Sequence, residues 1–421
     1  MNFAILPNLI ALTVLVAIFW TISRKATNER LHLWLAGWFL VLVHFMAQFV
    51  SAGQGAWARI ADTASLDSLV LAGIAFLISV SSMESSGKTQ MAVALAIPVV
   101  AYTTGVAWGI TSSMYYYALV VVGVVAPLVL LWRSGRKLTL FGVGTGLVLV
   151  AGITAWAIAR GTIDLGLITL LAALNFAVAL LYWNSYRRAT AGVVTGVAGF
   201  ALWGAVFPAG VLLQMFAPAA LPEAEAWNVP KYLVAVGMIL TLLEDQIETS
   251  KYLAYHDDLT GLPNRRLLED RLERALAHAR RAGTKVAVLQ LDLDHFKEVN
   301  DTYGHRVGDI ALRAVVARLA ACVQPGDTLA RSGGDEFTLI SDVPDPKGAE
   351  ALAEQLGLAL STPIRIDEYE VQTGLSIGVA LYPDDGNDPD QLHAAADRAM
   401  YIAKRATRIP PSIEILPPLS V

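Results

Sequence analysis

Charged residues and cysteine are both scarce in this 421-residue sequence. Asp, Glu, Lys and Arg make up 16% of the chain, and Cys322 is its single cysteine. One cysteine excludes an intramolecular disulfide bond and any cysteine-rich metal cluster, and we interpret Cys322 as a small core residue. Soluble domains are about 25% charged and about 45–50% apolar, whereas 55% of this chain is apolar. A wholly soluble protein is therefore not expected.

The charges are divided unevenly along the chain. Residues 1–243 contain 12 Lys and Arg against 7 Asp and Glu, whereas residues 244–421 contain 19 against 29. The second part therefore carries a net charge of −10. This balance argues against sequence-independent nucleic-acid binding, which relies on basic groups that meet phosphate. We expect two chemically different domains and no nucleic-acid partner.

Long apolar runs dominate residues 1–243. A helix needs about 20 mostly apolar residues to cross a membrane, and about nine such runs are present, of which the last is short. The first run is too long for a cleaved signal peptide and lacks a basic leader, so we expect it to be retained. The runs cover residues 3–22, 33–52, 66–83, 91–110, 115–132, 138–158, 166–183, 193–216 and 229–243.

Basic residues in the connecting loops indicate the orientation of these runs. Lys and Arg near helix ends stay on the cytoplasmic side, and here alternate loops are rich and poor in them. The rich loops follow the first, third, fifth and seventh runs. The pattern predicts a multi-pass protein of the bacterial inner membrane, with its N-terminus outside and residues 244–421 in the cytoplasm.

Few side chains inside the runs suggest chemistry. Only His44 is well placed, and a histidine hydrogen-bonded between helices is favoured over a ligand site; Glu84 is expected at a wetted run end. Glycines within the runs are expected to permit close helix packing rather than to line a pore. Tryptophans near run ends, including Trp20, Trp34 and Trp132, are expected at the membrane interface. The glycines are Gly142, Gly144, Gly146, Gly196 and Gly199.

Residues 244–257 are expected to continue the ninth run as a linker helix. Apolar residues recur at helical spacing across the join, while the positions between them are polar. This fits one helix that leaves the bilayer as a short amphipathic rod. A rod that pairs with a copy of itself is favoured over a solitary packed helix, although the stretch is too short to decide. The apolar residues include Val236, Leu240, Leu243, Ile247 and Ala254.

The second part of the chain alternates between helical and strand patterns. This alternation predicts one α/β domain of ordinary size. The expected order is a turn at 258–265, a helix from 267, a strand at 286–293, a polar turn, a helix around 311–319, a strand at 328–330, a turn at 333–334, a strand at 336–340, a helix at 349–360, a strand pair at 364–367 and 371–381, and a helix at 392–405.

Three acidic residues fall at expected strand ends. Asp292 ends the first strand, and Asp335 and Glu336 lie on the turn between two later strands. An antiparallel hairpin beside the first strand would bring the three together, and Mg²⁺ is the natural occupant of such a site. Gly333 and Gly334 would let the backbone turn tightly and approach a ligand. Spacing alone leaves solvated loop acids as the alternative.

Five ordered blocks of the second part resemble the GGDEF domain family. The signature is Arg331-Ser-Gly-Gly-Asp-Glu-Phe337, and together the blocks cover about the last 165 residues. The other blocks are Asp258-Leu-Thr-Gly-Leu-Pro-Asn264, Asp292-Leu-Asp-His-Phe-Lys-Glu-Val-Asn-Asp301, Gly304-His305 with Gly308-Asp309, and Ala396-Asp-Arg-Ala-Met-Tyr-Ile-Ala-Lys404.

The resemblance implies an activity and a fold. Members of this family are diguanylate cyclases, in which two GTP molecules on the two protomers of a dimer condense to cyclic di-GMP and two pyrophosphates. The fold is similar to the palm of polymerases and class III nucleotide cyclases, with a mostly antiparallel sheet flanked by helices. The implied domains are a multi-span domain at 1–243, the linker at 244–257, a GGDEF domain at 258–409 and a tail at 410–421.

The resemblance also implies roles for individual residues. Asp292, the carbonyl of Leu293 and Asp335 would hold Mg²⁺, with Mn²⁺ as the alternative ion, and Glu336 would support this shell or serve as a structural carboxylate. Asp335 is also the family's proposed base for the 3′-hydroxyl, and Lys297 completes the implied catalytic pair. Lys297, Lys404 and Arg408 are implied to face the triphosphate of GTP, as are the amides of the turn that begins at Phe296, for which a core side chain is the alternative. Asn300 and Asp309 are implied to read guanine, and His305 resembles a further pocket residue, with packing or capping as its alternative. Gly333 and Gly334 complete the residues implied to bind GTP.

Two departures from the family pattern matter. Many relatives carry an Arg-x-x-Asp motif that binds product as a brake, but the corresponding stretch here runs from Gln324 to Asp327. Without the arginine fork we expect little or no product inhibition. The usual glycine before the final arginine is replaced by Thr407, so Arg408 is the least secure of the implied residues.

Three readings follow for the whole protein. The favoured one is a membrane-embedded, Mg²⁺-dependent diguanylate cyclase that acts as a dimer and reaches cyclic di-GMP receptors only through its product. The alternatives are a catalytically silent GGDEF module that binds nucleotide, and a transporter with an appended regulatory domain. Few charges in the runs count against ion coupling. No phosphodiesterase domain is expected.

Overall fold

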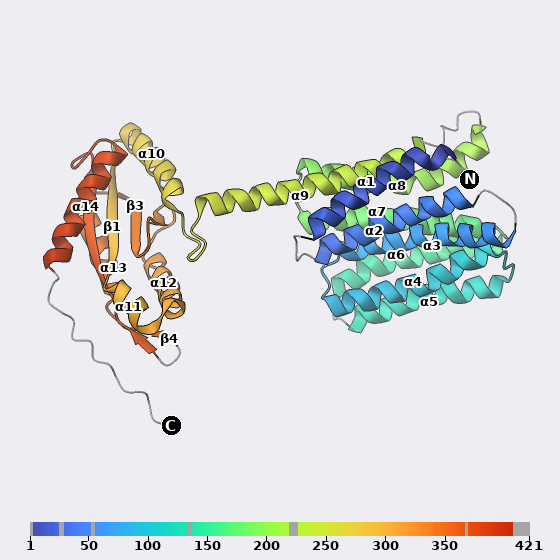
Figure 1. Cartoon of the computed structure of the whole chain (residues 1–421), viewed down its shortest axis with the longest axis horizontal. Coiled ribbons are helices and arrows are strands. Elements are labelled where there is room, and N and C mark those ends of the chain that lie inside the picture. Colours follow the sequence, from blue (N-terminus) through green and yellow to red (C-terminus); the bar gives the residue numbers. More distant parts are fainter. Residues whose placement is uncertain are drawn as a thin grey trace, which may run out of the picture. The chain divides into compact units, whose positions relative to one another are not determined.

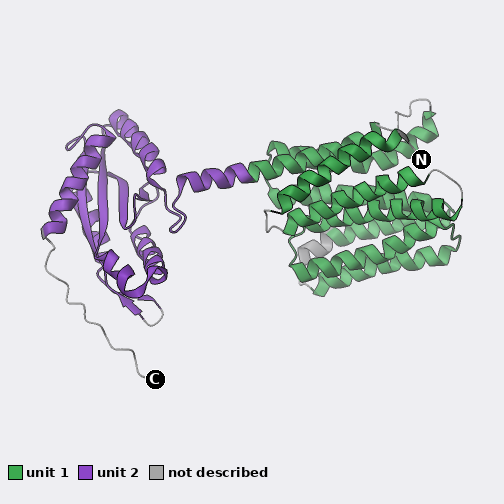
Figure 2. Ribbon diagram, in the orientation of Figure 1, with its two compact units in different colours: residues 1–245 green, residues 246–421 purple. Residues whose placement is uncertain are grey.

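The chain forms two compact units, residues 1–245 and residues 246–421 (Figure 2). They are called the helical unit and the α/β unit below. The computed structural model describes residues 3–24, 29–51, 55–133, 137–218, 226–366 and 369–406, without the side chains of residues 137–142. The predicted C-terminal tail at 410–421 and Arg408 lie outside the described residues.

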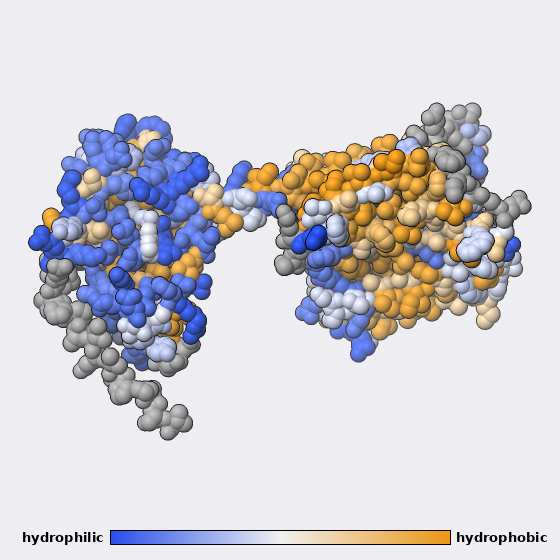
Figure 3. Space-filling model, in the orientation of Figure 1, coloured by the Kyte–Doolittle hydropathy of each residue, from blue (hydrophilic) through white to orange (hydrophobic). Residues whose placement is uncertain are grey.

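Long apolar helices make up the helical unit (Figure 1). Eight described helices are long and apolar enough to cross a membrane, and the apolar described part of α6, Val143–Ala159, is shorter. Figure 3 shows apolar residues covering much of the surface of this unit. The predicted N-terminal helical region with candidate membrane spans is confirmed. Its helices are α1 (Leu6–Ser23), α2 (Glu29–Val50), α3 (Ala56–Ser79), α4 (Ser85–Ala107), α5 (Ser113–Arg133), α6 (Lys137–Ala159), α7 (Ile163–Tyr186), α8 (Ala191–Phe216) and α9 (Val229–Tyr255).

The third helix begins ten residues before the predicted run at 66–83, and this shift places a carboxylate in mid-helix. Asp67 accepts hydrogen bonds from Thr103 and Thr104 on α4. The sequence analysis named only His44 as a well-placed ionisable group and therefore missed Asp67. Nδ1 of His44 lies 2.9 Å from the Ser65 hydroxyl and 2.8 Å from the Ser65 carbonyl. These contacts confirm the favoured interpretation of His44 as a histidine hydrogen-bonded between helices.

Aromatic side chains fill the centre of the helical unit. Trp34 and Trp38 are fully buried, and their indole nitrogens donate to the Ser79 hydroxyl and the Met238 sulfur. The interfacial position predicted for Trp34 is therefore wrong, because its ring packs among helices where Ser79 satisfies its polar end. Trp20 and Trp132 are exposed, as expected for interfacial residues.

Glycines bring α8 and α9 into backbone contact. A Cβ atom added to Gly237 would lie 2.3 Å from the backbone nitrogen of Gly196, and one on Gly199 would lie 2.6 Å from that of Val234. The prediction of close helix packing is confirmed at Gly196 and Gly199. Gly146 has no atom within 4 Å of such a Cβ and takes no part in it.

We predict that Gly237→Ala destabilises the helical unit by about 1–3 kcal/mol, because the added methyl group meets backbone that cannot turn aside. Thermal unfolding of the detergent-solubilised protein measures this. Gly210→Ala on α8 is the matched control, since its Cβ meets nothing within 4 Å and alanine favours a helix. Equal unfolding temperatures for the two variants would contradict the assigned contact.

The ninth helix continues well beyond the short predicted run at 229–243. It extends to Tyr255, which confirms that span and linker form one helix. At the boundary its acidic residues meet the start of α8: Thr190 donates to Glu244 at 2.5 Å, Gly192 N donates to Glu244 at 3.0 Å, and Arg188 pairs with Asp245. The amides at the start of α8 thus receive a carboxylate.

The α/β unit contains a four-stranded antiparallel sheet in the order β2-β3-β1-β6. The predicted antiparallel α/β fold is confirmed. Its strands are β1 (Lys285–Asp294), β2 (Thr328–Arg331), β3 (Glu336–Val343), β4 (Ile364–Ile366), β5 (Tyr369–Val371) and β6 (Gly374–Tyr382), and its helices are α10 (Arg265–Ala282), α11 (Phe296–Tyr303), α12 (His305–Ala320), α13 (Pro346–Ala359) and α14 (Pro389–Ala406).

Two details of the predicted order are wrong. The polar turn after the first strand contains helix α11, whose apolar Phe296 and Val299 are buried. The strand expected at 371–381 is two strands: β5 pairs with β4 in a separate hairpin, and β6 joins the main sheet beside β1. Gln372 and Thr373 lie between β5 and β6 and make the division.

The central strand β1 is buried on both faces. Val286 and Val288 pack with α10 and α14, whereas Leu289 and Leu291 belong to the core beneath α12 and α13. Helix α10 turns one apolar stripe, including Leu268, toward the sheet, and each fully buried leucine contributes about 1.5–3 kcal/mol. This two-sided burial fixes the register of the sheet and hence the position of its ends.

Candidate active site

The sheet register brings the predicted acidic residues to one edge. Asp292 is the cross-strand partner of Glu336, and the Leu293 amide donates to the Asp335 carbonyl at 3.2 Å. The end of β1 therefore meets the turn between β2 and β3. The side chain of Asp292 lies inward, with the residue 6% exposed, whereas Glu336 is exposed. The predicted meeting of the two acidic segments is confirmed.

The two glycines of the turn leave space rather than adopt special dihedral angles. Neither Gly333 nor Gly334 has the left-handed backbone conformation. A Cβ on Gly334 would meet no atom within 4 Å, and one on Gly333 would lie 3.2 Å from the Glu336 carboxylate. The expected use of glycine for a tight turn is therefore not its role here. The open face instead leaves room for close approach by a ligand.

Lys404 forms an ion pair with Asp292, the more buried acidic residue of this edge. Its Nζ lies 2.5 Å from Oδ1 of Asp292, across the boundary between α14 and β1. The hydrogen bond to Asp292 raises the pKa of Lys404, against the effect of burial, and the charges of Asp292, Asp335 and Asp294 raise it further. Sequence analysis placed Lys404 on a triphosphate; in the protein alone it neutralises Asp292 instead.

The donors fit a divalent cation only in part. Among the described residues, no group of three or more Asp, Glu, His or Cys side chains is arranged to hold a metal ion. Mg²⁺ is commonly bound by one or two carboxylates and completed by substrate phosphates. Asp292, Asp335 and the Leu293 carbonyl suit that incomplete set, because they provide hard oxygen donors at one edge and leave the remaining positions to a ligand.

The predicted guanine-binding residues gather at the junction of α11 and α12. Asn300 lies near the end of α11, and His305 and Asp309 lie exposed in the first turns of α12. A Cβ on Gly308 would lie 1.9 Å from the Asn300 amide oxygen, so glycine at 308 allows these helices to bring Asn300 beside Asp309. The chain turns between the helices at Gly304, whose φ is +82°.

The first turn of α11 carries the predicted phosphate contacts. Phe296 is buried in the main core, so its side chain is structural and only its amide is free for that role. Lys297 is exposed. His295, just before the helix, has φ +59°, a left-handed conformation that is uncommon for a residue with a Cβ. Its Nδ1 lies 2.7 Å from Glu298, which helps to hold this bend.

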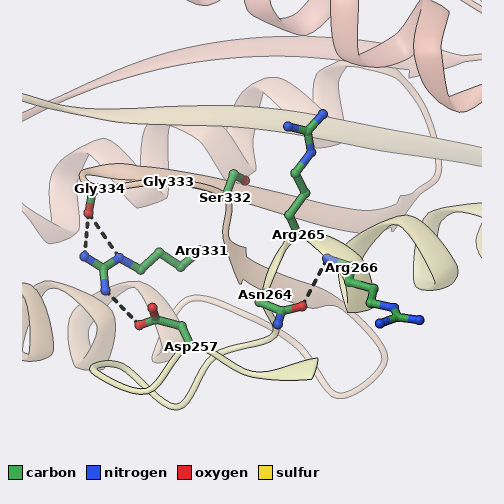
Figure 4. A pocket seen from close by; sticks show the side chains of 8 residues that line it. All are labelled: Asp257, Asn264, Arg265, Arg266, Arg331, Ser332, Gly333 and Gly334. Carbon is green, nitrogen blue, oxygen red and sulfur yellow. Dashed lines mark hydrogen bonds and ion pairs between the residues drawn. The ribbon is translucent and has the colours of Figure 1, made fainter. Parts of the chain in front are cut away.

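Arg331 contacts the glycine turn directly, a role that the sequence analysis did not assign. Its Nε and Nη2 donate to the Gly334 carbonyl at 3.1 and 2.7 Å, and its Nη1 lies 2.8 Å from Asp257 (Figure 4). These groups form one wall of a cavity of about 460 Å³. The cavity is lined by Asp257, Asn264, Arg265, Arg266, Arg331, Ser332, Gly333 and Gly334.

The pKa of the Asp257 carboxyl lies below its ordinary value, so the group stays ionised at lower pH. Burial alone would raise its pKa, but hydrogen bonds from Thr260 and from Arg331 outweigh burial and lower the pKa below the ordinary value of 3.8. A depressed pKa contributes stability that is present above the ordinary value and is lost as the pH falls through the native value.

We predict that Asp257→Asn lowers the free energy of unfolding of the α/β unit by about 1 kcal/mol at neutral pH. The deficit should vanish as the pH falls below the native pKa of Asp257, where the wild-type carboxyl is also neutral. Chemical denaturation followed by labelling of Cys322 with a dithiodipyridine reports this unit specifically. Asp258→Asn, at an exposed neighbour, is the control, and a deficit independent of pH would refute the ionic contribution.

The stretch from Gln324 to Asp327, predicted to be a degenerate product site, forms a closed turn. Asp327 Oδ2 accepts from the Gln324 amide at 2.9 Å, and the Asp327 amide donates back to the Gln324 carbonyl at 3.1 Å. Gly326 between them has φ +118°. The Asp327 carboxylate is thus used within its own loop, and residue 324 offers a neutral side chain where the family motif has a guanidinium group.

The α/β unit is thus a domain with an acidic sheet edge beside a glycine turn, and comparison with known proteins identifies its family. Residues 254–409 match the family described as "Diguanylate cyclase, GGDEF domain". The chain therefore contains a GGDEF domain.

Relatives with assigned names differ in what they are named for. The bifunctional diguanylate cyclase/cyclic di-GMP phosphodiesterase MucR of Pseudomonas aeruginosa is 44% identical over 41% of this chain and 27% of its own length. Diguanylate cyclase TpbB of the same species is 40% identical over 45% and 41%. Cyclic di-GMP phosphodiesterase PdeR of Escherichia coli is 40% identical over 42% and 26%. The chain spans less than half of each relative.

Two solved structures are each similar to a little over a third of this chain. A sensory box/GGDEF family protein from Caulobacter crescentus is 44% identical, with coverage of 36% of this chain and 99% of that one and a TM-score of 0.35. The GGDEF domain of TpbB from Pseudomonas aeruginosa is 42% identical, with coverage of 36% and 90% and a TM-score of 0.36.

Proposed function

We propose that this protein is a membrane-bound diguanylate cyclase that condenses two GTP molecules to cyclic di-GMP and two pyrophosphates. The observation that carries the proposal is the meeting of Asp292 with the Asp335 turn at the sheet edge. Relatives named for this activity support it. Other relatives are named as phosphodiesterases, and the chain spans a minority of the length of these relatives and of the named cyclases alike.

Residues at the edge would perform positioning and charge neutralisation. The 3′-hydroxyl of one GTP must attack the α-phosphorus of the other in line with the departing pyrophosphate. A bound Mg²⁺ ion, or Mn²⁺, would neutralise phosphate charge and lower the pKa of that hydroxyl. The ion would be held by Asp292, Asp335 and the Leu293 carbonyl, and Glu336 would support this set. Asp335 would also accept the hydroxyl proton.

Base recognition falls to the α11–α12 junction. An amide such as that of Asn300 can pair with O6 and N7 of guanine, and the Asp309 carboxylate can accept from N1 and the exocyclic amine. His305 is a third residue at the same junction. Lys297 and the amides of Phe296 and Lys297 would meet the triphosphate, as would Gly333, Gly334 and Arg408.

The Lys404–Asp292 pair reconciles two roles for Lys404. In the protein alone its ammonium group compensates the inward carboxylate of Asp292, whose burial would otherwise be costly. A cation on Asp292 would replace it and leave the lysine to the triphosphate. Lys404 is therefore a counter-ion before substrate arrives and a phosphate contact afterwards.

We predict that Asp335→Ala lowers cyclic di-GMP formation at least about 100-fold, because a carboxylate that holds the metal and receives the proton is lost. The assay is incubation of the solubilised protein with GTP and Mg²⁺, with chromatography of the products. Asp342→Ala, at an exposed position near the far end of β3, is the control. Equal product from wild type and Asp335→Ala, or none from either, would remove the assignment.

Product inhibition should be weak. The turn at Gln324–Asp327 lacks the arginine fork, and Asp327 is already bonded within it. Cyclic di-GMP added to the assay should therefore leave the initial rate nearly unchanged in wild type and in Asp327→Ala alike. Tight noncompetitive inhibition of wild type that Asp327→Ala abolishes would overturn this expectation.

A dimer on the inner membrane is part of the proposal. Neither protomer can complete a reaction of two bound GTP molecules alone, and α9 leaves apolar Val236, Leu243 and Ile247 exposed along one side. The alternation of basic loops supports an outside N-terminus and a cytoplasmic α/β unit. A reporter fused after Ser250 that responds outside the cytoplasm would refute this orientation.

A catalytically silent nucleotide receptor is the second candidate function. The open glycine turn and the Lys404–Asp292 pair would serve binding as well as catalysis. The retained Asp335 favours the cyclase, because its proposed role as a base is needed only for reaction. Guanine nucleotide binding without product in the GTP assay would decide for the receptor.

A further inference from the structure

Asn264 serves two helix ends with one side chain. Its Oδ1 accepts from the Arg266 and Leu267 amides at 3.0 and 3.2 Å, which caps the start of α10. Its Nδ2 donates to the Ala254 carbonyl at 3.0 Å, and its backbone amide donates to the Tyr255 carbonyl at 2.9 Å. Those carbonyls are at the end of α9, where no further turn of helix can satisfy them.

The same segment is tied to the catalytic hairpin. The Arg331 amide donates to the Pro263 carbonyl at 2.9 Å, and residues 264 and 331 form a parallel bridge. Arg331 then holds the Gly334 carbonyl through two N–H groups. Gly334 directly precedes Asp335. A series of hydrogen bonds therefore connects the last residues of α9 to Gly334, the residue before the proposed catalytic base Asp335.

Other hydrogen bonds also hold the glycine turn: the Leu293 amide donates to the Asp335 carbonyl at 3.2 Å, and the Ser332 and Thr338 hydroxyls lie 2.6 Å apart. The amides of Ser332 and Gly333 donate to the Glu336 carbonyl at 3.0 and 3.4 Å, and Gly334 has no side chain to pack. Glycine loses more conformational freedom on ordering than any other residue. Arg331 is the described side chain that holds the Gly334 carbonyl, and its own amide is bonded to the segment that Asn264 ties to α9.

We propose that Asn264 is a positioning residue that couples the end of α9 to the Ser332–Asp335 turn. This deepens the proposed cyclase function, on which its kinetic consequence rests. Capping α10 does not require asparagine, since aspartate and serine cap equally well. A carboxylate supplies acceptors alone, whereas the asparagine amide supplies an acceptor for α10 and a donor for α9 at once. The donor to Ala254 is the feature that capping leaves unexplained.

Asn264→Asp separates the two roles in the full-length protein. Aspartate keeps the acceptor for α10 but cannot donate to the Ala254 carbonyl, so the cap persists and the tie to α9 is lost. Asp345→Asn is the matched control: Asp345 caps α13 by accepting from Gly348 N at 2.8 Å, and asparagine retains that acceptor.

The expected result is a kcat at least about 5-fold lower for Asn264→Asp with a KM for GTP changed less than about 2-fold, because a positioning defect acts on the transition state more than on binding. Asp345→Asn should match wild type. The thermal unfolding temperature of Asn264→Asp should stay near that of wild type. Wild-type kinetics in Asn264→Asp, or equal losses in both variants, would overturn the proposal.

Hydrogen exchange gives a readout independent of catalysis. In Asn264→Asp the amides of Arg331, Ser332 and Gly333 should exchange faster than in wild type, whereas in Asp345→Asn they should not. If wild type makes no cyclic di-GMP, the proposed function fails while this measurement still decides the coupling. Unchanged exchange at the three amides in Asn264→Asp would refute it.

Discussion

The antiparallel register between β1 and β3 is the constraint on which the rest of this protein depends. It sets Asp292 opposite Glu336 and the Leu293 amide against the Asp335 carbonyl. A slip of one residue would send Asp292 to the other face of the sheet. Burial of β1 on both faces makes such a slip costly, so apolar packing remote from the edge determines where the carboxylates lie.

Two basic side chains pair with acidic and carbonyl groups at this edge when no substrate is bound. Lys404 neutralises the inward acid Asp292, and Arg331 joins Asp257 to the Gly334 carbonyl. Under the proposed function the first pair would exchange its lysine for a cation, whereas the second holds the turn in place. Polar contacts at the edge thus divide into an exchangeable pair for chemistry and a fixed set for position.

The sequence predicted the features that depend on local pattern. Apolar runs indicated the helices of the helical unit, and the acids at strand ends indicated the edge. The role of Asp67 was not predicted because residues 56–65 of α3 are mixed in polarity, so the predicted run began at 66 and put Asp67 near its end. Helix α11 was not predicted because it depends on burial of Phe296 and Val299. The contacts of Arg331 with Asp257, and of Asn264 with Ala254, join residues distant in sequence, which no local pattern reveals.

The most direct test of the account is a crystal structure of the protein with Mn²⁺ and a nonhydrolysable GTP analogue, in which anomalous scattering locates the ion. The account predicts Mn²⁺ bound by the carboxylates of Asp292 and Asp335, with the Lys404 ammonium moved from Asp292 to the triphosphate. Lys404 still paired with Asp292 while the nucleotide is bound, or an ion held away from both carboxylates, would contradict it.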